Sequence, residues 1–333
     1  MILAIESSCD DSSVAVIKTS DFSLVHYEKI SQEEEHAKYG GVVPELAARL
    51  HTKALPDIVL NAKPYFSSLK AIAVTTEPGL SVSLLPGIVA AKSLALALDL
   101  PIIAINHLIG HIYSLFLDSK VLLPLGVLLV SGGHTMILDI NENGEISVLC
   151  STSDDSFGES FDKCAKMLGL SYPGGPLIQE LALMGDDKAY NFTIPLKGTK
   201  RLEYSFSGLK NQVRLATLDK ELNEKEKSQI AASFERVACE HIIDRLKIIF
   251  AEKKWSNFGV VGGASANLRL RKSLENLCQT YNSKLLFAPL KYCSDNAYMI
   301  ARAALGKYAK SDFCDGFNVQ MKPRSDINKI FIN

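Results

Sequence analysis

The sequence predicts an α/β protein built from two similar halves. Each half opens with three strands in a meander and continues with helices that alternate with strands. Several strands, such as residues 125–130, are continuous apolar runs, which is typical of strands buried on both faces. Such a repeat within 333 residues indicates two related α/β domains that face one cleft.

The first half is expected to span residues 1–124. Pro44 marks the start of a helix, because proline is favoured in a first turn, and residues 83–98 are rich in the helix formers Ala and Leu. A further helix is expected directly after His107. The expected strands are residues 2–6, 13–18, 23–30, 71–75 and 101–105.

The second half is expected to span residues 125–294. Residues 185–225 are rich in Gly, Lys, Asp and Asn and indicate a less regular insertion, and residues 228–252 form a long amphipathic helix. The expected strands are residues 125–130, 135–140, 145–150, 258–261 and 284–287. The other expected helices cover about 159–168 and 175–184, the stretch up to about 280, and a segment beginning near Asp295.

Composition limits the classes of function. The formal net charge is −1, so a nucleic-acid partner needs a local basic patch or a second subunit, and the Lys/Arg stretches at 197–201 and 269–272 are candidate contacts. The seven cysteines form no Cys-x-x-Cys pair, which favours a reducing cytosol. The N-terminus lacks the features of a signal peptide, and no apolar run approaches about 18 residues. We therefore expect a cytoplasmic protein with no membrane partner.

His107 and His111 are the first candidates for chemistry. Histidines four residues apart share one face of a helix, so two imidazoles can converge on one metal ion. They follow a buried strand, and α/β sheets bind ligands where strands end. Taken alone, such a pair more often serves packing or lies on the surface.

Glycine-rich turns follow two other apolar strands. The Gly-Gly pair at 132–133 would let a backbone approach a ligand closely, although plain hairpin turns also use Gly-Gly. Residues 262–267 lie between a strand and a helix, where backbone amides favour an anion, and Asn267 would hydrogen-bond a ribose or base. Tight packing with an N-cap is the alternative there.

Four acidic residues stand at similar junctions. Asp10 and Asp11 occupy the turn after the first strand, where a carboxylate would orient a water or act as general base, unless the turn is simply solvated. Asp162 lies one turn beyond a helix start and would hold a ribose hydroxyl. Asp295 is either the N-cap of the last helix or a third metal ligand, and two histidines with one carboxylate suit Fe(II) or Zn(II).

Seen together and in order, these motifs resemble one family, the tRNA N6-adenosine threonylcarbamoyltransferases, once called O-sialoglycoprotein endopeptidases. The resemblance spans nearly the whole chain. It is carried by residues 5–11, 36–47, 106–111, 129–135, 161–163, 172–176, 204–210, 262–267 and 295–296.

The resemblance implies the actin-like ATPase fold of sugar kinases, Hsp70 and actin, with a C-terminal helix at about 295–325 completing the first domain. It implies transfer of a threonylcarbamoyl group from threonylcarbamoyl-adenylate to N6 of the adenosine 3′ of the anticodon, in tRNAs reading ANN codons, with release of AMP. It makes His107, His111 and Asp295 the ligands of one divalent metal ion, iron first and zinc second.

The same resemblance implies a site for the adenylate and two protein partners. The partners would be a catalytically inactive paralogue and a small P-loop ATPase, which help to bind tRNA. We hypothesise that Asp10 or Asp11 assists deprotonation of the attacking amine. The residues placed around the adenylate are Leu129, Val130, Ser131, Gly132, Gly133, Asp162, Gly175 and Asn267.

The chain departs from the family pattern at a few positions. Glu77 replaces a glycine, which would alter loop geometry or repel a nearby phosphate. Ser156 and Ser160 replace alanines, for which we expect no consequence. The rival functions are an ATP-dependent kinase of the same fold, a zinc peptidase and a non-catalytic scaffold paralogue. This chain has no His-Glu-x-x-His motif, which a zinc peptidase normally carries. A kinase would not need the histidine pair. A scaffold paralogue would be expected to lack the metal ligands, and all three are present here.

Overall fold

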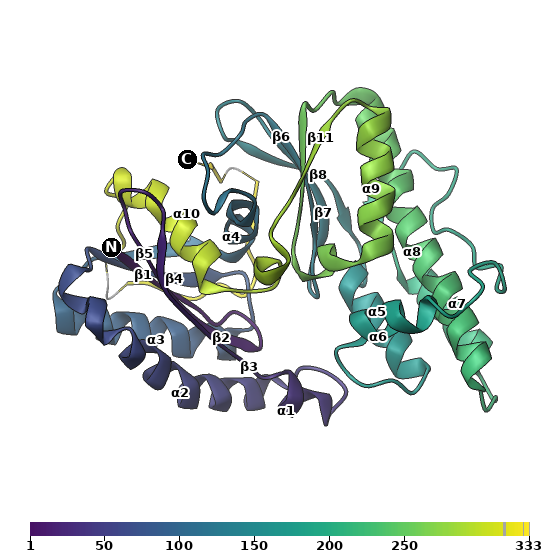
Figure 1. Cartoon of the computed structure of the whole chain (residues 1–333), viewed down its shortest axis with the longest axis horizontal. Coiled ribbons are helices and arrows are strands. Elements are labelled where there is room, and N and C mark those ends of the chain that lie inside the picture. Colours follow the sequence, from purple (N-terminus) through teal and green to yellow (C-terminus); the bar gives the residue numbers. More distant parts are fainter. Residues whose placement is uncertain (316–317, 329, 333) are drawn as a thin grey trace. The chain divides into compact units, whose positions relative to one another are not determined.

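The computed structural model describes the chain except residues 316–317, 329 and 333. Two compact units are present. Unit 1 consists of Met1–Val121 together with Ala288–Asn333, and unit 2 is Leu122–Phe287. Unit 2 is therefore inserted into the sequence of unit 1, and the C-terminal segment returns to the unit in which the chain began (Figure 1).

Unit 1 contains a five-stranded sheet in the order β3-β2-β1-β4-β5. β1 pairs antiparallel with β2 and parallel with β4, so a meander continues into parallel strands. All five residues of β1 are buried, because the strand lies in the middle of the sheet and is covered on both faces. The strands are β1 (Ile2–Glu6), β2 (Asp11–Ile17), β3 (Leu24–Ser31), β4 (Ala71–Glu77) and β5 (Ile102–Asn106).

The helices of unit 1 pack on both sides of this sheet. α2 and α3 contact each other below it, and α10 lies across it from the other side, where it contacts β1, β2 and α4 (Figure 1). The α-helices are α1 (Glu33–Ala37), α2 (Pro44–Asn61), α3 (Ser81–Leu98), α4 (His107–Tyr113) and α10 (Ala297–Ala309), and short 3-10 helices cover Lys63–Ser68, Ser114–Phe116 and Leu290–Tyr292. A segment from the end of the chain thus completes the core of unit 1.

Unit 2 repeats the same plan. Its sheet has the order β11-β10-β6-β7-β8-β9, in which β6, β7 and β8 form an antiparallel meander and β10 and β11 continue it in parallel. The strands are β6 (Leu125–Val130), β7 (Thr135–Ile140), β8 (Ile146–Thr152), β9 (Glu203–Tyr204), β10 (Asn257–Val261) and β11 (Lys284–Phe287). The expected duplication of a three-strand meander followed by parallel strands is confirmed.

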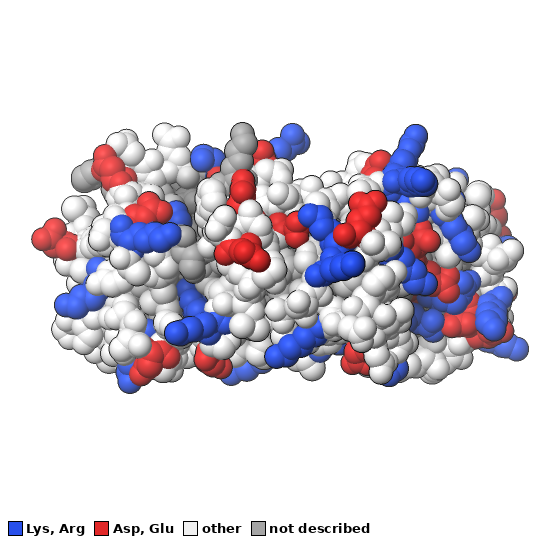
Figure 2. Space-filling model, turned by 90° about the horizontal axis from the view of Figure 1, so that it is seen from above, with Lys and Arg blue, Asp and Glu red and all other residues white. Residues whose placement is uncertain are grey.

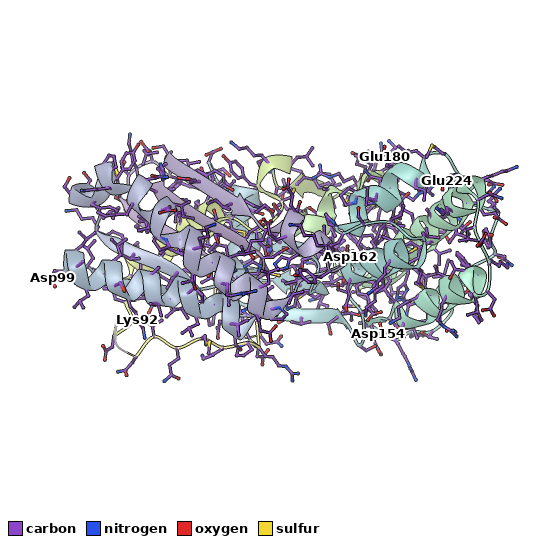
Figure 3. The ribbon with its side chains drawn as sticks, turned by 90° about the horizontal axis from the view of Figure 1, so that it is seen from below. Lys92, Asp99, Asp154, Asp162, Glu180 and Glu224 are labelled. Atoms are coloured by element: carbon purple, nitrogen blue, oxygen red, sulfur yellow. The ribbon has the colours of Figure 1, made fainter. Side chains whose placement is uncertain are left out.

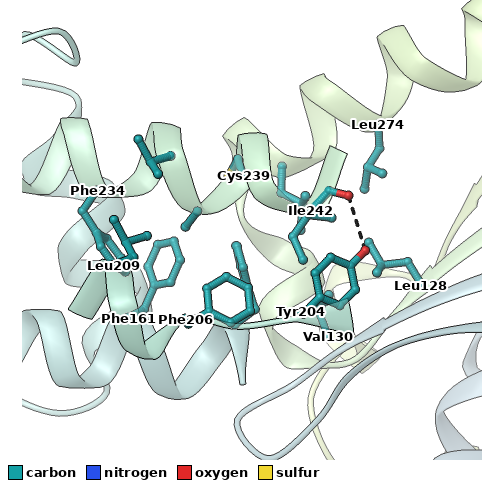
Figure 4. Packing of buried hydrophobic residues seen from close by; sticks show 14 of the residues in the cluster. Leu128, Val130, Phe161, Tyr204, Phe206, Leu209, Phe234, Cys239, Ile242 and Leu274 are labelled. Carbon is teal, nitrogen blue, oxygen red and sulfur yellow. Dashed lines mark hydrogen bonds between the residues drawn. The ribbon is translucent and has the colours of Figure 1, made fainter. Parts of the chain in front are cut away.

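The core of unit 2 is rich in aromatic side chains (Figure 4). Phe161 and Phe234 meet edge to face at 5.0 Å, and the hydroxyl of the buried Tyr204 donates to the carbonyl of Ile242 at 3.3 Å. The helices are α5 (Phe157–Met167), α6 (Gly174–Ala182), α7 (Ser207–Thr217), α8 (Glu224–Glu252) and α9 (Leu268–Thr280), with a 3-10 helix at Gly263–Ala266. Helix α7 lies within the stretch for which composition indicated only irregular structure.

One helix among the described residues, α3, is long and apolar enough to cross a membrane by length and composition. The sequence analysis did not anticipate this candidate, because it considered only uninterrupted apolar runs, and Lys92 interrupts this one. In unit 1 the helix packs against β4 and α2, with Leu84, Ile88 and Ala91 buried. Figure 3 shows Lys92 on this helix and Asp99 at its C-terminal cap.

Candidate metal centre

Helix α4 presents two histidines at the end of a buried strand. Asn106 caps the helix, because its side-chain oxygen accepts from the backbone amides of Leu108 and Ile109. With Asn106 as the cap, His107 is the first residue of the helix. His107 and His111 therefore lie one turn apart on the same face. Their rings are 4.6 Å apart edge to face, and both side chains are buried.

Asp295 faces this pair from the other end of the chain. Its Oδ1 lies 3.4 Å from Nε2 of His107 and 3.1 Å from Nε2 of His111. The N-cap of α10 is the next residue, Asn296, whose side chain accepts from the amide of Met299. Asp295 is therefore not the cap, and its carboxylate is free to point at the histidines.

The three side chains form a group that could hold a metal ion, because their ligand atoms all lie within 4.8 Å of one another. When two ligand atoms bind the same metal ion at about 2 Å in tetrahedral geometry, they lie about 3.3 Å from each other. The distances from Asp295 Oδ1 to Nε2 of His107 and of His111 are close to this value. Both nitrogens of the fully buried His111 lack a partner with hydrogen-bond geometry among the described residues, although Asp295 Oδ1 lies near Nε2. Such a buried, unsatisfied imidazole is expected of a metal ligand.

Glu6 orients one of the histidines from behind. Its Oε2 lies 3.0 Å from Nδ1 of His107, while Thr75 donates to the same oxygen at 2.6 Å. The backbone amide of Ser8 donates to Oε1 at 2.6 Å. Because a carboxylate only accepts, Nδ1 of His107 carries the proton and its Nε2 faces Asp295. Glu6 lies within the 5–11 stretch that carries the resemblance, but no role was predicted for it. Its place as an acid at the end of an apolar strand (Ile-Leu-Ala-Ile-Glu) could have indicated one.

The charges of the group are strongly coupled. Burial opposes ionisation of Asp295, but the positive field of His107 and the close approach of both imidazoles hold the pKa of Asp295 well below its usual value. Burial alone would lower the pKa of His107, yet Asp295 and Glu6 raise it well above normal. Burial, reinforced by the charge of His107, lowers the pKa of His111. Carboxylates thus stabilise positive charge at this point, as a cation site requires.

A second acidic position lies close by in unit 1. Asp10 is in the turn after β1, and Asp11 begins β2, where its Oδ2 pairs with Lys29 at 2.5 Å and its buried Oδ1 has no hydrogen bond. Burial raises the pKa of Asp11 to about 7, although Lys29 opposes the shift. The Lys29 ammonium also donates to the carbonyl of Asp295 at 3.1 Å. Lys29 thereby joins this turn to the histidine group, and no local sequence pattern indicated it.

Comparison with known proteins identifies the family. A family model described as TsaD, tRNA N6-adenosine threonylcarbamoyltransferase, matches residues 23–302. The chain belongs to this family. A relative of that name from Campylobacter concisus (strain 13826) is 61% identical over the full length of both chains. Another from Campylobacter fetus subsp. fetus (strain 82-40) is 59% identical over 98% of each chain. The predicted family and the prediction of a transferase enzyme are confirmed.

Solved structures confirm the predicted fold class. A crystal structure of full-length HypF in its phosphate- and nucleotide-bound form has a TM-score of 0.61 at 15% identity, covering 92% of this chain and 46% of that one. Component A of the Acidaminococcus fermentans (R)-2-hydroxyglutaryl-CoA dehydratase has a TM-score of 0.51 at 14% identity, covering 93% and 97%. These similarities show the actin-like ATPase fold alone.

The residues that the threonylcarbamoyltransferase pattern places around an adenylate all lie in unit 2. Ser131, Gly132 and Gly133 form the turn between β6 and β7, directly after Leu129 and Val130. A side chain at Gly132, Gly133 or Gly175 would meet nothing within 4 Å, so the backbone is open to a ligand there. Unit 2 thus leaves these three glycines accessible.

Two other members of that set already have structural partners. Asp162 accepts from the amide of Gly174 at 2.8 Å and so joins α5 to α6. Asn267 caps α9 by accepting from the amide of Leu270, and it donates to Glu235 at 2.7 Å. The N-cap that was the alternative reading of Asn267 is therefore present, and a ligand role remains a prediction.

Two departures from the family pattern have visible consequences. Glu77 ends β4, whose register with β5 shifts between Thr75 and Glu77, and its carboxylate lies 3.4 Å from Nζ of Lys322. Ser156 caps α5 and donates to the carbonyl of Gly132 at 2.7 Å. The expectation that Ser156 has no consequence is wrong, because an alanine there would lose both contacts. Ser160 donates only to the preceding turn of its own helix, at Phe157.

Proposed function

We propose that this chain transfers a threonylcarbamoyl group from threonylcarbamoyl-adenylate to N6 of the adenosine 3′ of the anticodon in tRNAs that read ANN codons, releasing AMP. Membership of the family supports the reaction, since near full-length relatives carry its name. The convergence of His107, His111 and Asp295 carries the assignment to an active member, because an inactive scaffold has no need for three buried or half-buried ligand side chains that meet at one point.

In this proposal the three side chains hold one divalent metal ion, Fe(II) first and Zn(II) second. Two imidazoles and one carboxylate with open positions are typical of both metals. When bound, the ion supplies Lewis-acid polarisation of a phosphate or carbamoyl oxygen. Glu6 fixes the tautomer of His107, and Asn106 holds the helix start that sets the spacing of the pair.

The adenylate is assigned to Leu129, Val130, Ser131, Gly132, Gly133, Asp162, Gly175 and Asn267 in unit 2. Open backbone at the three glycines supports this assignment, because successive amides can approach phosphate oxygens there. The hydroxyl of Ser156 braces the turn from α5. Holding the adenylate in one orientation would place its carbonyl to meet the incoming amine.

Asp11 is the stronger candidate for the group that accepts the proton of the attacking amine, with Asp10 beside it. A general base works best when its pKa lies near the working pH. The pKa of Asp11 is raised by burial to about 7, and its Oδ1 has no hydrogen-bond partner among the described residues. The ion pair with Lys29 holds Oδ2 of Asp11 and so fixes the direction in which Oδ1 points.

The protein partners of the proposal are a catalytically inactive paralogue and a small P-loop ATPase. An exposed apolar stripe on α3 supports docking of a protein. Its residues, Val82, Leu85, Val89 and Leu96, are spaced by three, four and seven, the pattern of a helix that meets another helix. We also infer a cytoplasmic location, which the free cysteines of the described chain support.

The test is reconstitution with threonylcarbamoyl-adenylate, unmodified tRNA and the two partner proteins. We expect His111→Ala and Asp295→Ala to lose bound metal and to transfer the group at least about 100-fold more slowly, as expected for lost Lewis-acid stabilisation. His26→Ala is the matched control, because its partly buried imidazole lies near Glu28 and the ring of Tyr65 and is not part of the histidine group. Full activity and unchanged metal content in both ligand variants would refute the assignment.

A further inference from the structure

Unit 2 carries a groove of about 390 Å³ between α5 and α7, which we call the α5/α7 groove. Its lining consists of Lys163, Lys166, Met167, Lys210, Asn211 and Arg214. Four of these side chains are cationic and none is acidic. Figure 2 shows basic and acidic side chains intermingled on the face seen from above. A groove lined by one sign of charge concentrates anions.

The charges of this groove are only partly neutralised. Asp155 lies behind it and pairs with Lys163 at 2.5 Å and with Lys210 at 2.6 Å. Glu159 also contacts Lys163, at 2.9 Å. Lys166 is exposed and has no ion pair among the described residues, while Arg214 bonds only to the neutral Asn211. Two lysines are therefore fixed in place, and an excess of two positive charges is open to solvent.

We propose that the α5/α7 groove binds phosphates of the tRNA backbone. Lys163 and Lys166 lie one turn apart on α5, and Lys210 and Arg214 lie one turn apart on α7, so the groove offers two short rows of cations. Phosphate oxygens are the groups that such rows bind in nucleic-acid complexes. The proposal rests on the proposed function, which makes tRNA the substrate.

The place of the groove in the fold supports this partner. Lys163 directly follows Asp162, which belongs to the set assigned to the adenylate (Figure 3). A tRNA held along α5 would therefore lie beside the group it is to receive. Only Met167 contributes an apolar side chain, whereas protein interfaces have an apolar core. The lining thus favours a phosphate backbone over an acidic protein.

The basic stretch at 269–272 is less suited to this role. Arg269 is paired with Asp187 at 2.9 Å and with Glu235 at 3.2 Å. Arg271 donates to the carbonyl of Ser265, and its guanidinium stacks 4.2 Å from the ring centre of Phe287. These arginines stabilise unit 2 itself, so fewer of their donors remain for an external anion.

The test measures binding of an unmodified tRNA transcript to the full-length chain by fluorescence anisotropy over a series of KCl concentrations. The double variant Lys166→Ala/Arg214→Ala removes the two uncompensated charges without disturbing Asp155. We expect this double variant to bind tRNA about tenfold more weakly than wild type. The slope of the logarithm of its binding constant against the logarithm of the KCl concentration should be smaller in magnitude by about 2. The control Lys188→Ala/Lys225→Ala removes two other exposed lysines, outside the groove and outside both basic stretches, and should retain the wild-type slope and affinity. Circular dichroism should show wild-type folding in both.

Wild-type affinity and slope in the double variant would overturn the proposal. A second result would also overturn it: polyglutamate binds the wild-type chain, and the double variant loses polyglutamate binding but keeps tRNA binding. That result would indicate that the groove binds an acidic protein. In the reconstituted reaction we expect the KM for tRNA to rise about tenfold while kcat is retained at saturating tRNA. If the double variant shows the smaller slope but the wild-type protein transfers no group in the reconstituted reaction, the groove stands and the proposed function fails.

Discussion

Glu6 Oε2 lies 3.0 Å from Nδ1 of His107, and this contact determines which nitrogen of the ring faces Asp295. Both side chains are buried, so solvent does not compete for the contact. Thr75 and the amide of Ser8 hold the same carboxylate by two further hydrogen bonds. The orientation of His107 is therefore fixed before any metal ion arrives, which lowers the entropic cost of binding.

The first prediction concerns this contact. Glu6→Gln should weaken metal affinity about 10- to 100-fold, because an amide adds no negative charge behind the ring and its NH2 would face a donor where a carboxylate oxygen now accepts. Affinity would be measured by competition with a chelator of known strength. Glu33→Gln, on an exposed position of α1, serves as the control and should bind as the wild type does. Unchanged affinity in Glu6→Gln would show that the carboxylate only supports packing.

The second prediction concerns Lys29 and Asp11. The Lys29 charge opposes the burial that raises the pKa of Asp11 to about 7. Lys29→Met should therefore move that pKa to a higher value, since burial and the charges of Asp295 and Asp10 all favour the protonated acid. Carbon-13 NMR of the Asp11 carboxyl in the metal-free chain would follow the titration, with Asp11→Asn identifying the signal. A titration that stays at the wild-type pH would contradict the contact.

The third prediction concerns the turn after β10. Gly262 has φ of +94°, and a Cβ there would lie 2.2 Å from the carbonyl oxygen of Val130. Gly262→Ala should lower the free energy of unfolding by at least about 2 kcal/mol, because strain and a backbone clash add. Gly208→Ala on α7, where a Cβ meets nothing within 4 Å, should leave stability unchanged or slightly raised. Urea titration measures both, and equal midpoints would contradict the prediction.

The fourth prediction concerns His241, which is buried in unit 2. Burial, aided by the charge of Arg245, lowers its pKa from 6.5 to about 4. The unfolded chain then binds the proton more readily, so stability is full above pH 6.5 and falls between about 6.5 and 4, by roughly 3 kcal/mol in all. His241→Phe should remove this part of the pH dependence. Urea midpoints at pH 7 and 4.5 give the comparison, and an identical acid loss in the variant would refute it.

The pattern of the sequence was sufficient for the strands other than β9 and for the histidine pair. The spacing of His107 and His111 is a local property of one helix, and strand patterns such as residues 125–130 report burial directly. The role of Asp295 is not local. Both an N-cap and a ligand were compatible with its position, and only the folded chain, in which Asn296 takes the cap, excludes the N-cap; the ligand role stays a prediction.

Other features could not be read from neighbouring residues. Lys29 lies on a half-buried strand without a motif, and its contacts with Asp11 and Asp295 depend on how β3 meets the end of the chain. Helix α7 lies in a stretch rich in breakers and charges, so composition alone favoured a loop, whereas burial of Leu209 and Val213 against the core of unit 2 stabilises it. Tertiary packing decided these positions.

The insertion of unit 2 into unit 1 has a consequence for synthesis of the protein. His107 and His111 are made early, but Asp295 and the helix that follows it are made only after all of unit 2 has been translated. A nascent or truncated chain lacks the carboxylate ligand and the strand-covering α10. Under the proposed metal assignment, tight metal binding would therefore require that translation has reached α10, and it would distinguish chains that carry Asp295 from shorter fragments.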